Sequence, residues 1–152
     1  MKEQADHYDA DLLLRLYDMR REEKLRQARD WFFREFQADS MDDLYKRFPL
    51  GSKENDYYRM VVSYWEMAGS IVKRGLINEE LFFENNGEMW GVWSKIKQVV
   101  PELRTMWKNP HIYRNLEAIA EKYEQWMEAR APGALSLMHE RFKSIVAKGK
   151  DR

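Results

Sequence analysis

Apolar residues in this chain recur every three or four positions, and breaks containing Gly, Pro, Asn or Ser separate the runs. This spacing places apolar side chains on one face of an α-helix, whereas a half-buried strand requires alternation with a period of two. No long stretch of the chain alternates in that way. The sequence therefore predicts an all-α single domain over residues 1–152, an irregular bundle of about five to seven helices.

Capping and breaking residues predict where these helices begin and end. Ser and Asn favour helix starts, while Gly and Pro favour helix ends. We expect helices over residues 9–37, 41–48, 53–74, 79–84, 88–107, 110–129 and 135–147. Pro101 should kink or restart the helix that contains it, because proline removes one backbone hydrogen bond. The helix over 53–74 should lie near the centre, since apolar residues cover more than half of its circumference.

Composition excludes several classes of protein. With 44% hydrophobic and 34% charged residues, the chain is too apolar to be disordered. Lys and Arg number 26, as do Asp and Glu, so no net charge favours a nucleic-acid partner or an anionic membrane. The most apolar stretch, Met60 to Val72, is too short for a membrane span. We expect a cytoplasmic protein with no nucleic-acid partner and no membrane span.

The sequence contains no motif typical of a catalytic or metal site. It has no cysteine, and none of its three histidines (His7, His111 and His139) follows a Glu by three positions as in helical di-metal sites. It also lacks a glycine-rich phosphate loop and a Gly-x-Ser-x-Gly elbow. We therefore assign no catalytic residue, no metal ligand and no cofactor. This favours a protein that is not an enzyme, with an unrecognised enzyme as the alternative.

One hypothesis places a ligand pocket around Glu66, which is the single charge between Val61 and Val72. Its helix offers no basic residue three or four positions away, and a buried carboxylate without a partner is costly. Arg104 is the first candidate partner. Trp90 lies beside its apolar stripe and Trp93 lies within it, so the candidate ligand-binding residues are Glu66, Trp90, Trp93 and Arg104. The alternative is that Glu66 forms a fixed ion pair or faces solvent, and that the aromatic residues fill the core.

The N-terminal helix suggests a surface for self-association. Its leucines, Leu12, Leu13 and Leu16, precede the stretch "RREEK" (residues 20–24), which offers no apolar side chain for more than a turn. Either the helix bends there, or residues 1–20 project as an arm that needs a partner. The simplest partner is a second copy of the chain. The basic segment 148–152 should be a frayed tail.

A row of acidic residues lies along one flank of the helix over 110–129, and its members are Glu117, Glu121, Glu124 and Glu128. Like charges at this spacing weaken an isolated helix, so one interpretation is that a basic neighbour compensates them, and the alternative is a charged face exposed to solvent. Arg20, Arg21 and Lys24 could supply the basic neighbour, within the chain or across a homodimer. These basic and acidic residues complete the candidate interface.

One stretch resembles a known family. The segment "SYWEMAGSIVKRGLINEEL" (residues 63–81), followed by Trp93 and Arg104, is similar to an uncharacterised bacterial all-helical family, one of the domains of unknown function. The shared features are Tyr64, Trp65 and Glu66, then the Gly-Leu-Ile of residues 75–77, then a Trp and an Arg. The resemblance covers about residues 28–127 and implies the helical fold, but no reaction and no ligand. Relatives often carry an N-terminal membrane helix, whereas this chain begins with a charged amphipathic helix.

Two functions remain open on this reading. The first is a non-enzymatic interaction or regulatory module that binds itself or another protein. The second is a small-molecule-binding protein or unrecognised enzyme whose pocket includes Glu66, Trp90, Trp93 and Arg104. The first is favoured, because no catalytic motif is present.

Overall fold

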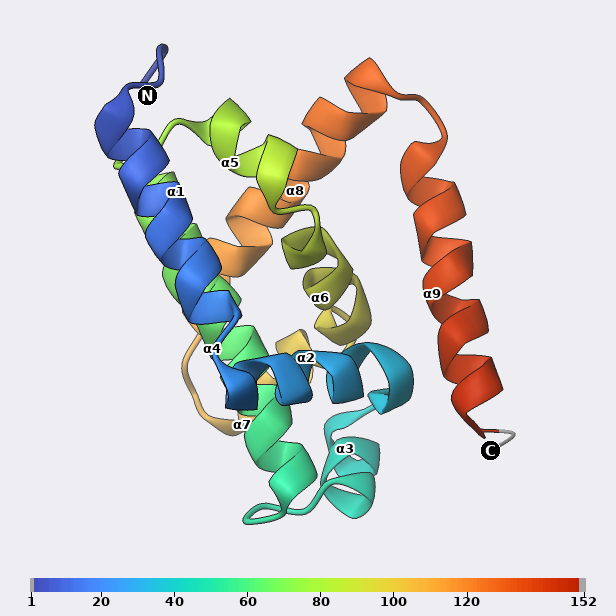
Figure 1. The fold of residues 1–152 in the computed structure, drawn as a ribbon. Helices are drawn as coiled ribbons and strands as arrows, with labels where there is room; N and C mark the ends of the chain where they lie inside the picture. The colour runs from blue at the N-terminus through green and yellow to red at the C-terminus, as the bar shows by residue number, and fades with distance from the viewer. Residues whose placement is uncertain (1, 151–152) are drawn as a thin grey trace.

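The computed structural model describes residues 2–150, and every regular element within them is an α-helix (Figure 1). The helices of this part of the chain are α1 (His7–Arg20), α2 (Glu23–Glu35), α3 (Met41–Arg47), α4 (Lys53–Lys73), α5 (Glu79–Asn85), α6 (Glu88–Ile96), α7 (Val100–Met106), α8 (Arg114–Arg130) and α9 (Ala134–Lys150). The all-α class is confirmed. The expectation of five to seven helices is too low, because two of the predicted helices are each broken in two.

The first break lies at Arg21 and Glu22, inside the predicted helix over 9–37. The backbone of Glu22 leaves the helical region, and its carboxylate caps α2 by accepting a hydrogen bond from the Leu25 N–H (3.0 Å). Before this bend, α1 does not project but lies beside α4 (Figure 1). Leu16 is only 3% exposed, and its carbonyl accepts a 2.6 Å hydrogen bond from the Tyr64 hydroxyl of α4.

The second break divides the predicted helix over 88–107 into α6 and α7. Pro101 occupies the first turn of α7, where its missing N–H costs nothing, but it could not continue a helix from α6. Proline thus restarts the helix. At the other end of the chain, the tail predicted to fray from residue 148 is helical to Lys150. Residues 151–152 of that tail lie outside the described residues.

Helix α4 lies at the centre of the bundle, as predicted, and packs against α2, α6 and α8. Trp65 and Val61 on α4 are fully buried. The adjacent Phe82 and Phe83 of α5 are both buried on different sides, Phe82 facing Trp65 and Phe83 facing Tyr123 of α8. These aromatic residues therefore fill the space between helices.

Helix α9 lies along one side of the body (Figure 1). Phe142 contacts Phe33 of α2, with ring centroids 5.6 Å apart. Gly91 of α6 lies beneath this contact, where an added Cβ would come within 3.0 Å of the Phe142 ring. A glycine at this position lets α9 approach α6 closely.

Asp9 attaches the start of α1 to the start of α5. Its buried carboxylate accepts hydrogen bonds from the backbone N–H of Asp6 (2.8 Å) and of Asn78 (2.9 Å), and Lys2 lies 2.9 Å away. Burial alone would raise the pKa of Asp9, but these three donors outweigh it and lower the pKa to about 2.

Lys95 on α6 closes the C-terminal end of α2. Its ammonium donates hydrogen bonds to the carbonyls of Phe32 (2.8 Å) and Phe33 (3.3 Å) in the last turn of the helix, and the Phe32 carbonyl also accepts one from the Phe36 N–H (3.2 Å). Burial lowers the pKa of Lys95 to about 8, because the charged form is poorly solvated there.

We predict that Asp9 makes stability sensitive to acid. Its folded pKa of about 2 lies below the reference value of 3.8, so its contribution is present above pH 3.8 and is lost as the pH falls towards 2. Asp9→Asn should therefore lower the free energy of unfolding at neutral pH and flatten its fall in acid, as measured by urea denaturation. Asp30→Asn, which changes an exposed carboxylate of α2, should change neither.

Lys95 should add a second rise of stability with pH, in alkali. Its pKa is about 8 in the folded protein against 10.5 for an unperturbed lysine, so the unfolded state binds more protons between these values. Stability that depends on Lys95 should thus rise with pH across this window. The check is the difference in unfolding free energy between wild type and Lys95→Met. If that difference is the same at pH 8 and at pH 10.5, the lowered pKa of Lys95 is wrong.

Candidate self-association surface

Glu66 caps the first turn of α8. One carboxylate oxygen accepts hydrogen bonds from the backbone N–H (3.2 Å) and side-chain amide (2.8 Å) of Asn115, and the other accepts one from the Leu116 N–H (2.7 Å). These N–H groups have no partner within their own helix, and the N-terminal end of a helix favours negative charge. Tyr113, at the N-cap position, supplies no side-chain cap, so the cap comes from α4.

The predicted start of this helix at residue 110 is wrong by one turn. Asn109 does not cap a helix at Pro110; its side chain accepts a hydrogen bond from the His111 N–H (3.0 Å) within a turn, and α8 begins at Arg114. Gly69, one turn after Glu66, allows the approach of α8. An added Cβ there would lie 3.1 Å from the backbone carbonyl of Asn115.

Arg104 does not pair with Glu66, although both hold the start of α8. The guanidinium of Arg104 donates a hydrogen bond to the Ile112 carbonyl (2.9 Å) and forms an ion pair with Glu117. The predicted Glu66–Arg104 pair is thus replaced by two separate attachments of the same helix, one from α4 and one from α7. Both side chains have structural partners in this arrangement.

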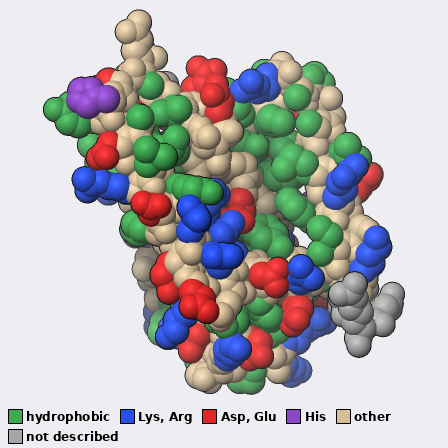
Figure 2. Space-filling model, viewed as in Figure 1, with side chains coloured by type: hydrophobic (Ala, Val, Ile, Leu, Met, Phe, Trp, Pro, Cys, Tyr) green, Lys and Arg blue, Asp and Glu red, His purple; other side chains and the backbone are tan. Residues whose placement is uncertain are grey.

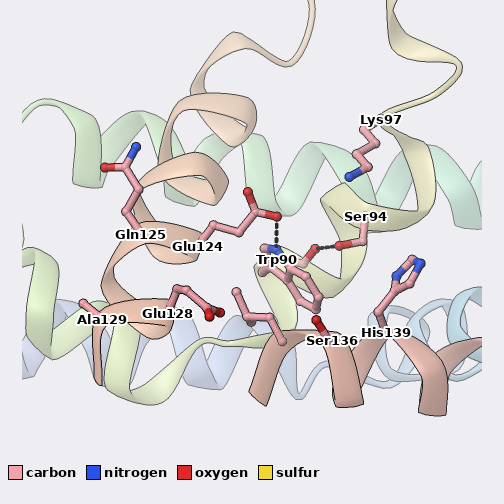
Figure 3. Close-up of a pocket in the computed structure, with 10 residues that line it drawn as sticks. Trp90, Ser94, Lys97, Glu124, Gln125, Glu128, Ala129, Ser136 and His139 are labelled. Atoms are coloured by element: carbon pink, nitrogen blue, oxygen red, sulfur yellow. Dashed lines mark hydrogen bonds between the residues drawn. The ribbon is translucent and has the colours of Figure 1, made fainter. Parts of the chain in front are cut away.

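The two tryptophans of the predicted pocket also separate. Trp93 is half-buried against the core. Trp90 is 4% exposed, and its indole N–H donates a hydrogen bond to Glu124 of α8 (3.1 Å). Trp90 lines a groove between α6, α8 and α9, shown in Figure 3, whose lining includes neither Glu66 nor Arg104. The four predicted residues therefore do not form one site.

The acidic residues along α8 do not contact Arg20, Arg21 or Lys24, and most of them bind other groups. Glu117 contacts Arg104 and Arg114, Glu124 contacts Trp90, and Glu128 accepts a hydrogen bond from the Gly133 N–H (3.3 Å). Glu121 is exposed.

The basic residues at the end of α1 lie over aromatic rings instead. Arg20 lies over Trp65 (5.7 Å), Arg21 lies over Tyr17 (5.4 Å), and Lys24 is exposed. Their pairing with the acidic flank inside one chain was therefore a wrong expectation. Pairing across a homodimer stays a prediction.

Helix α1 has apolar side chains on both its inner and its outer side. The predicted interface leucines face the body, since Leu16 is buried while Leu12 and Leu13 are half-buried against the core. Leu14 and Tyr17 point outward and are 61% and 46% exposed. The run of three leucines at 12–14 was the signal for this surface, because consecutive residues on a helix cannot share one face.

Charged residues of alternating sign surround Leu14 and Tyr17. At 100° per residue, Asp11, Arg15, Asp18 and Arg21 fall on the same outward half of α1, and all four are exposed. Figure 2 shows hydrophobic, acidic and basic side chains interspersed along this part of the surface. We name these six residues the α1 surface.

Known proteins give limited information about this site. The family model described as Domain of unknown function (DUF4760) matches residues 6–123. No curated protein and no solved structure matches the chain. Among residues 2–150, none of the helices has the length and apolarity needed to cross a bilayer, and no three His, Cys, Asp or Glu side chains are grouped as a metal site.

Removal of the Glu66 carboxylate should destabilise the fold. Glu66→Ala leaves the first N–H groups of α8 without their acceptor, and we expect a loss of about 1–3 kcal/mol in the free energy of unfolding, measured with urea. Glu121→Ala is the control on α8, and its exposed side chain should change stability by less than about 0.5 kcal/mol. Equal values for the two variants would show that the cap contributes little.

Proposed function

The chain belongs to the DUF4760 family, a domain of unknown function, and from the geometry we propose that it is a non-enzymatic interaction module that forms a homodimer through the α1 surface. The observation that carries this proposal is the exposed apolar pair Leu14 and Tyr17, on a helix whose opposite face is already buried. Exposed apolar side chains gathered on one helix are typical of an interaction surface.

Charge on the α1 surface favours a second copy as the partner. In an antiparallel contact about a two-fold axis near the middle of α1, Asp11 lies opposite Arg21 of the partner subunit, and Arg15 lies opposite Asp18 of the partner subunit. A parallel contact would place each charge opposite its own copy. A two-fold contact requires one surface to complement itself. The order Asp, Arg, Asp, Arg along α1 complements itself only when the two copies of α1 run antiparallel.

The apolar pair and the charges have different roles in this dimer. Leu14 and Tyr17 lie near the axis and lose apolar surface to water on association, which supplies the attraction. Exposed ion pairs contribute only about 0.2–1 kcal/mol each, so the four charges select the orientation. A contact made by one helix from each subunit should bury less than the ~1,200 Å² of stable interfaces, so we expect a weak dimer that dissociates on dilution.

Leu14→Asp should abolish the dimer. We expect wild-type protein to show a concentration-dependent mass in light scattering after size exclusion, with a dimer at high concentration, and the variant to remain a monomer. Leu50→Asp is the matched control, since Leu50 is 64% exposed in the turn before α4 and lies outside the α1 surface. A monomeric wild type at every concentration, or the same effect from both variants, would contradict the proposal.

A charge exchange tests the antiparallel orientation. Asp11→Arg or Arg21→Asp alone places like charges opposite each other and should weaken the dimer, whereas the double variant should restore it. Sedimentation equilibrium measures the three dissociation constants. Failure of the double variant to recover affinity would rule out this orientation even if the dimer exists.

A further inference from the structure

A groove of about 740 Å³ lies between α6, α8 and α9, within the ~300–1,000 Å³ range of small-molecule sites. Trp90 and Leu135 form its apolar floor and are 4% and 7% exposed. The charged side chains of the walls supply the groups that can distinguish one ligand from another. Figure 3 shows these side chains around Trp90.

One wall of the groove is acidic. Glu124 and Glu128 are one turn apart on α8, and one oxygen of each is held, by the Trp90 indole N–H (3.1 Å) and by the Gly133 N–H (3.3 Å). Within residues 2–150, neither carboxylate forms an ion pair with a described Lys, Arg or His. Their second oxygens therefore remain available to a cation.

The other wall is basic. Lys97 follows the last residue of α6, His139 lies on α9, and Figure 3 shows both across the groove from Glu124 and Glu128. Lys97 also forms no ion pair within the described part of the chain. Within the described residues, neither Lys97 nor His139 forms an ion pair with Glu124 or Glu128, so both walls keep polar groups that a ligand can contact.

We propose that this groove binds a zwitterionic ligand of the size of a short peptide. The ammonium groups of the ligand lie against Glu124 and Glu128, and its carboxylate lies against Lys97 and His139. A polyamine would satisfy only the acidic wall and repel the basic one, and a dicarboxylate would do the reverse. The groove is separate from the α1 surface, and three of these four residues follow residue 123, where the family match ends.

The test uses three tripeptides that differ in the charged groups they carry. Lys-Gly-Gly carries ammonium groups at one end and a carboxylate at the other, its C-terminal amide lacks the carboxylate, and N-acetyl-Gly-Gly-Gly lacks the ammonium groups. The probe is the indole N–H resonance of Trp90 in ¹H–¹⁵N spectra, assigned with Trp90→Phe. Because this N–H donates to Glu124, a cation that binds the carboxylate shifts it.

We expect saturable shifts with Lys-Gly-Gly. N-acetyl-Gly-Gly-Gly, which loses the groups that face both Glu124 and Glu128, should bind most weakly, and the C-terminal amide should bind about fivefold more weakly than Lys-Gly-Gly, as for the loss of one exposed ion pair. Glu124→Gln, which keeps an oxygen for Trp90, and Lys97→Gln should each weaken Lys-Gly-Gly to a similar extent. Glu121→Gln on the same helix should not. No saturation by about 10 mM, equal affinity for all three peptides, or an equal effect of Glu121→Gln would overturn the proposal.

Discussion

The contact between α4 and the first turn of α8 determines the arrangement of the C-terminal half of the molecule. The start of α8 has no cap of its own, and Glu66 supplies the acceptor while Gly69 leaves room for the backbone. With α8 fixed at this end, its later turns bring Tyr123 against Phe83 and Glu124 against Trp90. One carboxylate and one missing side chain on α4 thereby set the register of the helix that forms the acidic wall of the groove.

Capping from a neighbouring helix recurs elsewhere in the fold. Lys95 of α6 binds the last carbonyls of α2, Asp9 of α1 binds the backbone N–H of Asn78 at the start of α5, and Glu102 of α7 binds the Met41 N–H at the start of α3 (3.2 Å). Each contact gives a polar partner to backbone groups at a helix end, where the hydrogen bonds of the helix itself run out. Short helices joined by brief turns are thus held at their ends by polar side chains and along their length by apolar ones.

The spacing of apolar residues was sufficient to predict the helical class, the central position of α4 and most helix boundaries, because these features depend on residues a few positions apart. The same spacing could not predict where α8 begins or which groups bind Glu66. Both depend on a contact between residues 49 positions apart, which no local pattern encodes. Of the candidate site residues, Trp90, Glu124 and Glu128 do line one groove, but they came from two separate hypotheses. The outward face of α1 was overlooked because the prediction named Leu12, Leu13 and Leu16 as the interface leucines of this helix and left Leu14 out.

The attachment of α1 also has a consequence for biosynthesis. Asp9 binds a residue 69 positions later, and Leu16 binds one 48 positions later. At roughly 5–20 residues per second, a ribosome needs about 3–14 s to add the 69 residues between Asp9 and Asn78. During that interval both the inner and the outer apolar side chains of α1 are exposed on the nascent chain. The N-terminal helix is therefore the segment on which a chaperone would act for longest, whereas α9 emerges when the rest of the body can already receive it.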